Sequence, residues 1–155
     1  MLAIRTILHP TDFSRNCNHA FPLACSLARD HGARLVVMHV AESPNVPRVE
    51  EGNIVQPDED PFKSRERLLE SEYDTISIEY RVERGSAAEE ILRVAREIQC
   101  DLIVLGTHGR TGFPRFVLGS VAEAVLRNAP CPVLTVKVPM PNAAQVVRPR
   151  EEATP

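Results

Sequence analysis

The chain has 155 residues, of which 43% are apolar and 25% are charged, and its formal net charge at pH 7 is −3. This length suits one domain with its own hydrophobic core, and the slightly acidic balance argues against a general nucleic-acid binder or a protein held on acidic membranes. No apolar run approaches the roughly 20 residues that span a bilayer, and the N-terminus lacks the pattern of a signal peptide. We therefore expect a cytoplasmic protein that binds neither nucleic acid nor membrane.

The first predicted strand covers residues 2–9 and ends at the Pro-Thr-Asp turn of residues 10–12. A helix is predicted over residues 14–31, with Gly32 suited to its C-terminal end. Pro22 lies inside this segment and removes one backbone donor. We therefore expect the helix either to start late or to kink near residue 18.

A second strand is predicted over residues 34–40, and its nearly continuous apolar run indicates burial on both faces, as in a parallel sheet. Residues 41–60 are rich in proline and acidic residues and are predicted to form a mobile surface loop. A helix is predicted over residues 61–73. Apolar and polar residues alternate over residues 75–83, which is typical of a half-exposed strand at a sheet edge.

Two segments with the sequence Ser-x-x-Glu, residues 86–89 and 120–123, predict helix starts of the capping-box type. The first helix has an apolar face that extends to about Ile98, and the second helix ends before Pro130. The residues predicted to face inward from the second helix are Val121, Val125 and Ala129.

Strands are also predicted over residues 101–106 and 133–138, so five strands alternate with four helices. This alternation predicts an α/β fold, a single doubly wound domain over residues 1–138 with helices on both faces of a parallel sheet. The proline-rich residues 139–155 are predicted to form a disordered tail. Ligands of such sheets bind at the carboxyl ends of strands, where the strand order reverses.

The segment of residues 106–121 follows a predicted strand and holds four of the seven glycines, with Arg110 and Arg115 as its only charges. Glycine lets backbone N–H groups approach an anion, and a helix N-terminus adds unpaired N–H groups and partial positive charge. The segment contains no lysine, so it is not a Walker A loop, and it also lacks the Gly-x-Gly-x-x-Gly spacing of dinucleotide folds. We expect Arg110 to neutralise phosphate, and we expect Ser120 to be an N-cap, a phosphate ligand or both.

The four cysteines are Cys17, Cys25, Cys100 and Cys131, and no two of them form a Cys-x-x-Cys pair. No histidine near them has a ligand-like spacing either. We therefore expect neither a zinc site nor a disulfide framework, and we predict four reduced thiols in or near the core.

Several stretches together resemble the signature of universal stress proteins. They are Gly-Thr-His-Gly-Arg-Thr-Gly at 106–112, Gly-Ser-Val-Ala-Glu at 119–123, Ala-Pro-Cys-Pro-Val-Leu at 129–134, and the predicted first, second and fourth strands. The resemblance covers residues 2–138 and implies a five-stranded parallel sheet in the order 3-2-1-4-5. Because Gly106, Gly109, Gly119 and Ser120 are all present, it also implies the ATP-binding branch of the family.

The resemblance further implies a role for each matched residue. Pro10 and Thr11 would flank the adenine, Asp12 would bond the ribose, and the backbone of Val40 would contact the adenine edge. The residues implied to hold the phosphates of ATP, together with any Mg²⁺ or Mn²⁺ that the phosphates bind, are Gly106, Gly109, Arg110, Gly119, Ser120 and Val121. The strand of residues 133–138 resembles the family's dimer edge, so a homodimer is expected.

Three functions remain open from the sequence. The first is an ATP-binding regulatory or protective protein of the stress response, whose nucleotide-dependent conformation is recognised by an unknown protein partner. The second is a slow ATP hydrolase, although no residue that could position the attacking water is identified and no catalytic residue is expected. The third is a nucleotide-free dimeric interaction scaffold, in which the glycines serve only the geometry of turns.

Overall fold

The computed structural model describes residues 3–41, 48–50, 53–55, 73–107 and 118–137. Five of its strands form one parallel sheet in the order β5-β2-β1-β6-β7. These strands are β1 (Thr6–Pro10), β2 (Arg34–Ala41), β5 (Ile78–Arg84), β6 (Leu102–Gly106) and β7 (Val133–Val136). When only the five strands of this sheet are numbered along the chain, their order is 3-2-1-4-5. This order confirms the predicted α/β fold class.

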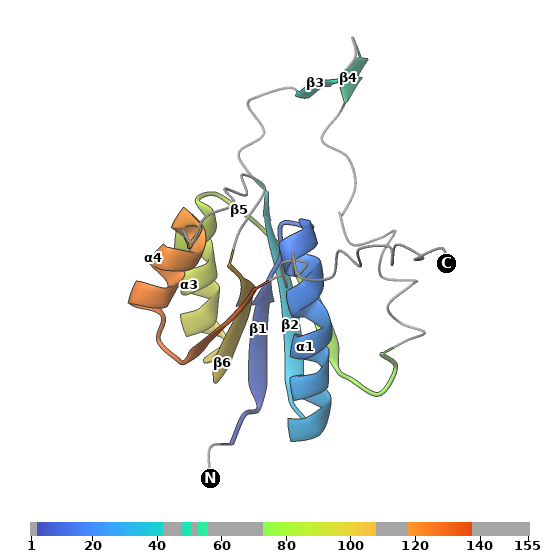
Figure 1. The fold of residues 1–155 in the computed structure, drawn as a ribbon, viewed down its shortest axis with the longest axis vertical. Coiled ribbons are helices and arrows are strands. Elements are labelled where there is room, and N and C mark those ends of the chain that lie inside the picture. Colours follow the sequence, from blue (N-terminus) through green and yellow to red (C-terminus); the bar gives the residue numbers. More distant parts are fainter. Residues whose placement is uncertain (1–2, 42–47, 51–52, 56–72, 108–117, 138–155) are drawn as a thin grey trace, which may run out of the picture.

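Helices cover both faces of the sheet (Figure 1). The helices of the described residues are α1 (Arg15–His31) on one face and α3 (Ala87–Glu97) and α4 (Ser120–Asn128) on the other. Strand residues alternate between the two buried clusters, so that Ile7 and Leu35 pack on the side of α1 whereas Leu8 and Val36 pack on the side of α3 and α4. As its apolar run predicted, β2 is buried on both faces.

Helix α1 begins directly after the turn that follows β1. Ser14 is its N-cap and accepts a hydrogen bond from the N–H of Cys17 at 3.4 Å, so the helix does not start late. It continues through Pro22, which is exposed. Gly32 ends it with φ of 61°, and the N–H of Ala33 donates to the carbonyl of Ala28 at 2.8 Å, as expected for a glycine C-terminal cap.

Neither predicted capping box is present. Ser86 occupies the N-cap of α3, but its hydroxyl makes no capping hydrogen bond in the described structure. The N-cap of α4 is Gly119, whose carbonyl accepts from the N–H of Glu123 at 2.8 Å, and Ser120 is the first helical residue. The predicted inward position of Val121 is also wrong: this side chain is 39% exposed, and the buried side chains of α4 are Ala122 and Val125, which lie three residues apart on one helix face.

The structure also departs from the predicted loop of residues 41–60. Two short strands there, β3 (Arg48–Glu50) and β4 (Asn53–Val55), pair antiparallel. The β-branched residues of these two strands favour extended backbone. The loop was predicted because prolines and acidic residues surround them in the sequence. The predicted helix over residues 61–73 and the predicted tail lie outside the described residues, apart from Tyr73, which is not helical.

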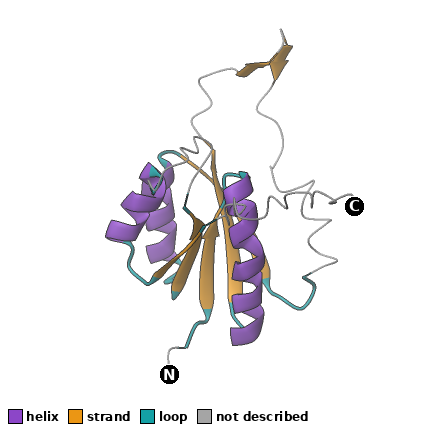
Figure 2. Cartoon of the chain, in the orientation of Figure 1, coloured by secondary structure: helices purple, strands orange, loops and turns teal. Residues whose placement is uncertain are grey.

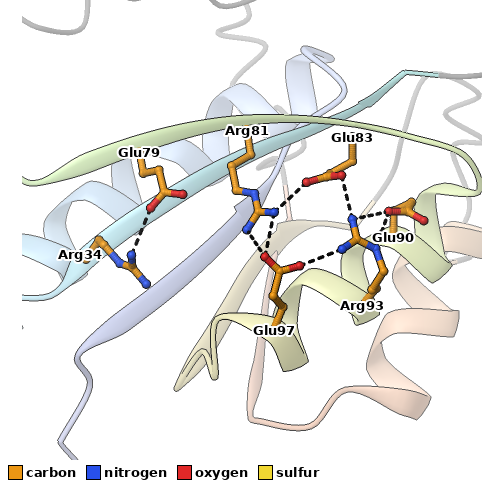
Figure 3. Close-up of polar contacts among 7 residues, drawn as sticks. All are labelled: Arg34, Glu79, Arg81, Glu83, Glu90, Arg93 and Glu97. Atoms are coloured by element: carbon orange, nitrogen blue, oxygen red, sulfur yellow. Dashed lines mark hydrogen bonds and ion pairs between the residues drawn. The ribbon is translucent and has the colours of Figure 1, made fainter.

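Strand β5 lies at an edge of the sheet, as predicted. Figure 2 shows the strands of this sheet as a layer with helices on either side. Its polar side chains form an ion-pair network with α3, in which Arg81 contacts Glu97 at 3.0 Å and Glu83 at 2.9 Å (Figure 3). Arg93 of α3 reaches Glu83 at 2.7 Å, so both arginines share this carboxylate. These charged side chains of β5 are therefore partly covered by a helix. Because they share partners, the network contributes more stability than an isolated surface ion pair.

Asp101 fixes the amino ends of β1 and β6 beside each other. Its Oδ2 accepts hydrogen bonds from the N–H groups of Arg5 at 2.8 Å and Thr6 at 2.9 Å, and its own N–H donates to the carbonyl of Thr6 at 2.8 Å. The two strands then pair from Ile7 with Leu102 onward. One carboxylate thus sets the register of the two strands that carry the predicted site.

We expect Asp101→Ala to lower the free energy of unfolding by about 1–3 kcal/mol, because two backbone N–H groups lose their acceptor. Asp101→Asn keeps an oxygen at this position and should lose clearly less. Urea unfolding of the three proteins measures the difference. Equal losses for the two variants would contradict the role of the carboxylate oxygen as acceptor.

Candidate functional site

The predicted site segments meet at the carboxyl edge of the sheet, because all strands are parallel and β1 neighbours β6. The ladder between β1 and β6 includes Ile7 and Leu8 but ends there. Along β1, the backbone groups of alternate residues point to β2 and to β6 in turn. The N–H of Thr11 donates to Met38 of β2, whereas the carbonyl of Thr6 accepts from Asp101 on the side of β6. Pro10 has the same parity as Thr6 and therefore faces β6. Proline has no N–H to donate, and the strands therefore stop pairing at the point where the strand order reverses.

The turn after β1 is held by a series of bonds from side chains to the backbone. Thr11 Oγ1 accepts from the N–H of Phe13 at 3.0 Å, and Asp12 Oδ1 accepts from the N–H of Ser14 at 2.8 Å. Phe13 has φ of 61°, which is uncommon for a residue with a large side chain. These hydrogen bonds, followed by the Ser14 cap of α1, stabilise that backbone and fix the position of the turn.

His39 of β2 supports the same turn from the side. Its Nδ1–H donates to the carbonyl of Thr11 at 2.9 Å, and its ring lies 4.9 Å from the ring of Phe13, centroid to centroid. The carbonyl can only accept, which fixes the proton of His39 on Nδ1. The turn is therefore attached to β2 as well as to β1.

Val40 lies in β2 beyond the last residue of β1. Met38 accepts from Thr11 on the side of β1, whereas Ala41 accepts from Gly85 on the side of β5. Since backbone groups alternate along a strand, the N–H and C=O of Val40 face the side where β1 has already ended. Their direction fits the predicted contact with a base edge.

Gly106 ends β6, and the chain returns to the same place at α4. The N–H of Thr107 donates to the carbonyl of Val136 at 3.1 Å, and the N–H of Gly119 donates to the carbonyl of Thr107 at 2.9 Å. This second bond closes the base of the segment between β6 and α4. The N–H of Gly119 is therefore used within the protein.

The start of α4 presents its backbone donors at this edge. The first hydrogen bond within the helix joins Glu123 to Gly119, so the N–H groups of Ser120, Val121 and Ala122 precede the helical ladder. Ser120 is exposed, and its hydroxyl does not cap the helix. Such a helix start suits an anion.

Asp12 is the half-buried carboxylate of this edge. Burial raises the pKa of its carboxyl, but hydrogen bonds from Ser14 and Cys17 outweigh burial and hold that pKa below the ordinary value. The group is therefore ionised at neutral pH and accepts hydrogen bonds only. A negative acceptor suits a ligand hydroxyl and disfavours direct contact with phosphate.

Eight of the ten predicted binding residues are described, and they lie at or near the carboxyl ends of β1, β2 and β6 or at the start of α4: Pro10, Thr11, Asp12, Val40, Gly106, Gly119, Ser120 and Val121. Gly109 and Arg110 lie outside the described residues. The supporting roles of His39 and Thr107 were not predicted from the sequence, since both depend on partners in distant segments of the chain. The position of His39 next to Val40 in the second strand was the one available signal.

His9 lies beneath the turn and is fully buried. Its Nδ1–H donates to the carbonyl of Val104 at 2.8 Å, which replaces the ladder bond that β1 no longer makes to β6, and its ring lies 5.7 Å from that of Phe21. Nε2 has no hydrogen-bond partner within the described part of the chain. Burial lowers the pKa of His9 to about 4, although the bond to Val104 opposes the shift, so the ring is neutral at pH 7.

Comparison with known proteins identifies the class. The family model described as the universal stress protein family matches residues 3–137, and the chain belongs to this family. A universal stress protein of Methanocaldococcus jannaschii is 35% identical over 143 residues, which cover 87% of this chain and 83% of that protein. The solved structure of UspA from Lactobacillus plantarum has a TM-score of 0.69 at 25% identity and covers 86% of this chain and 97% of its own.

Two further solved structures share the fold and carry ligands. A universal stress protein in complex with cAMP has a TM-score of 0.60 and covers 87% of this chain and 98% of its own. The universal stress protein of Archaeoglobus fulgidus in complex with dAMP has a TM-score of 0.56 and covers 88% and 100%. Both are 22% identical to this chain.

Across the described residues, no three histidine, cysteine or acidic side chains are grouped so that they could hold a metal ion. Among the same residues, no helix has the length and apolar character needed to cross a membrane.

We expect the buried His9 to make the protein less stable at acidic pH. Its pKa is near 4 in the folded state and near 6.5 in the unfolded state, so the unfolded state takes up a proton first as the pH falls. The stability is fully present above pH 6.5 and declines between pH 6.5 and 4, by about 3 kcal/mol in total.

His9→Gln should be less stable at neutral pH but should lack this part of the decline, as measured by urea unfolding across that pH range. His19→Gln, at an exposed position of α1, is the matched control and should keep the wild-type slope. If His9→Gln and the wild type decline in parallel, His9 is not the group that titrates.

Proposed function

We propose that this universal stress protein binds ATP at the carboxyl edge between β1 and β6 and acts as a regulatory or protective protein of the stress response. In this proposal a protein partner distinguishes the nucleotide-bound state from the free state. The observation that carries it is the convergence of the Thr11–Asp12 turn, the backbone of Val40 and the start of α4 at the point where the strand order reverses.

The adenosine part of the ligand fits the side of the edge formed by β1 and β2. The N–H and C=O of Val40 offer a donor and an acceptor to a base edge, and Pro10 and Thr11 would flank the ring. Asp12, ionised and accepting, suits the ribose hydroxyls. The cAMP and dAMP complexes of two proteins with this fold support an adenine nucleotide as the class of ligand.

The phosphates fit the start of α4, where three backbone N–H groups have no acceptor within the helix. The hydroxyl of Ser120, which does not cap the helix, is a further donor there. In this proposal Gly119 borders the phosphates without donating its N–H to them, since that N–H closes the base of the segment on Thr107. We assign further phosphate contacts to Gly106, Gly109 and Arg110, and Mg²⁺ or Mn²⁺ would be held by the phosphates themselves.

Thermal unfolding with and without Mg-ATP tests the proposal. ATP at 100 times its dissociation constant should stabilise the protein by about 2.7 kcal/mol. Ser120→Asp adds a negative charge at the first residue of α4, which favours the helix but repels phosphate. We expect this variant to unfold at or above the wild-type temperature without ATP, and to show a much smaller shift with ATP.

The control places the same charge at the start of another helix. Ser86 is the exposed N-cap of α3. This helix follows β5, an outer strand that β2 separates from β1. Ser86→Asp should keep the full shift with ATP. The absence of any shift in the wild type at millimolar ATP, or an equal loss in both variants, would contradict ATP binding at α4.

We also propose a homodimer through β7, which forms the other edge of the sheet. Within the described sheet, β7 pairs on one side with β6, so its outer side faces away from the other strands. Leu134 on this strand is 36% exposed, and Leu126 of α4 is 49% exposed. A second copy adding its own edge would cover unpaired backbone groups and apolar side chains together.

Leu134→Lys should produce a monomer, because a charged residue blocks pairing at an edge strand. Light scattering after size exclusion should give about twice the monomer mass of 17.2 kDa for the wild type and the single mass for the variant. Leu23→Lys, at a similarly exposed leucine of α1, should remain a dimer. A monomeric wild type, or a dimeric Leu134→Lys protein, would count against this interface.

A further inference from the structure

Cys100 and Cys131 are 31 residues apart in the sequence, but their sulfur atoms lie 3.3 Å from each other. Both are free thiols; Cys100 is buried, and Cys131 is partly exposed. They precede β6 and β7, at the amino edge of the sheet, opposite the candidate nucleotide site. Their spacing in the sequence gave no sign of this contact.

The backbone holds both cysteines in place. The N–H of Cys100 donates to the carbonyl of Ala95 at 3.1 Å, and the next residue, Asp101, is tied to β1 through its carboxylate. Cys131 lies between Pro130 and Pro132, whose rings restrict the backbone on either side. The carbonyl of Pro132 accepts from the N–H of Ile103 at 3.0 Å, so the two segments are also joined directly.

We propose that Cys100 and Cys131 are an oxidation site, at which a hydroperoxide converts the two thiols into a reversible intramolecular disulfide. A disulfide has an S–S length of about 2.05 Å, so the sulfur atoms need to approach by roughly 1.2 Å from their present separation. The bond would close a loop of residues 100–131, which contains β6, α4 and the segment that joins them.

The reaction begins at Cys131, the more exposed thiol. Burial raises the pKa of both thiols and keeps the pKa of Cys131 above its ordinary value. The hydrogen bond between them opposes this shift at Cys131 and adds to it at Cys100, which makes Cys131 the more acidic of the two. Its thiolate attacks one oxygen of hydrogen peroxide, which gives a sulfenic acid and hydroxide. The sulfur of Cys100 then attacks the sulfenic sulfur, and the departing hydroxyl leaves as water with the thiol proton. Two thiols and one peroxide thus give one disulfide and two waters.

The remaining cysteines serve as internal controls. Cys17 and Cys25 are buried and lie on α1, on the opposite face of the sheet from α3 and α4. A metal site at the pair is not indicated, since the described residues hold no group of three potential ligands. The arrangement at the amino edge therefore fits oxidation of two neighbouring thiols.

The test treats the full chain with hydrogen peroxide at mildly alkaline pH, blocks the remaining thiols by alkylation and digests the protein with trypsin without reduction. Cleavage after arginine and lysine places Cys100 in residues 97–110, Cys131 in residues 128–137, and both Cys17 and Cys25 in residues 16–29. We expect mass spectrometry to find residues 97–110 linked to residues 128–137, with dithiothreitol restoring both free peptides. Sulfinic acid at Cys131 beside alkylated Cys100, or a link to residues 16–29 as the main product, would overturn the proposal.

A second measurement does not depend on peptide recovery. The Cys17→Ser, Cys25→Ser double variant should oxidise like the wild type, and its melting temperature should rise by about 5–10 °C on oxidation because the closed loop restricts the unfolded chain. Cys131→Ser should show no rise under the same treatment. A melting temperature that stays unchanged or falls when the linked peptide forms would contradict a disulfide formed within the native fold. Neither measurement involves ATP, so failure of this proposal leaves the nucleotide site untouched.

Discussion

Pro10 faces β6 and has no N–H to donate, and the paired ladder between β1 and β6 ends before it. Proline is rarely tolerated in a central strand, but here its missing donor ends the pairing at the point where the strand order reverses. The buried ring of His9 bonds the carbonyl of Val104 at that point. The turn of residues 10–14, the backbone of Val40 and the start of α4 all lie at the carboxyl end of the sheet, where this ladder stops, and the proposed function depends on that arrangement.

The amino and carboxyl ends of the parallel strands form two edges of the sheet that differ in their local chemistry. At the amino edge, Asp101 ties β1 to β6, and Cys100 contacts Cys131 beside the entrance to β7. At the carboxyl edge, side chains stabilise the backbone of one turn, and backbone N–H groups precede the ladder of α4. The amino edge thus sets the register, while the carboxyl edge offers donors and acceptors for a ligand. A disulfide at Cys100 and Cys131 would reinforce the strand and helix that lead to and from the proposed phosphate site.

The sequence predicted the sheet well because burial has a clear periodicity. The continuous apolar run of β2 and the alternation along β5 gave a central strand and an edge strand, and the order followed from the family resemblance. The helix starts were predicted less well: Ser120-x-x-Glu123 matches a capping box, but packing of Ala122 and Val125 against the core places Gly119 at the cap. Contacts between distant segments, such as His39 with Thr11 and Cys100 with Cys131, have no local signal, since they arise only when the strands are ordered.

The proposed function places an adenine nucleotide at the carboxyl edge of the sheet, where the β1–β6 ladder ends. An NMR titration of ¹⁵N-labelled protein with Mg-ATP tests it most directly, because each backbone N–H reports its own surroundings. We predict the largest shifts at Thr11, Asp12 and Val40 and at Ser120 and Val121, with little change at Cys100 and Cys131 on the opposite edge. No shifts at millimolar ATP, or shifts concentrated at the amino edge or along β7, would contradict a nucleotide site at the carboxyl edge.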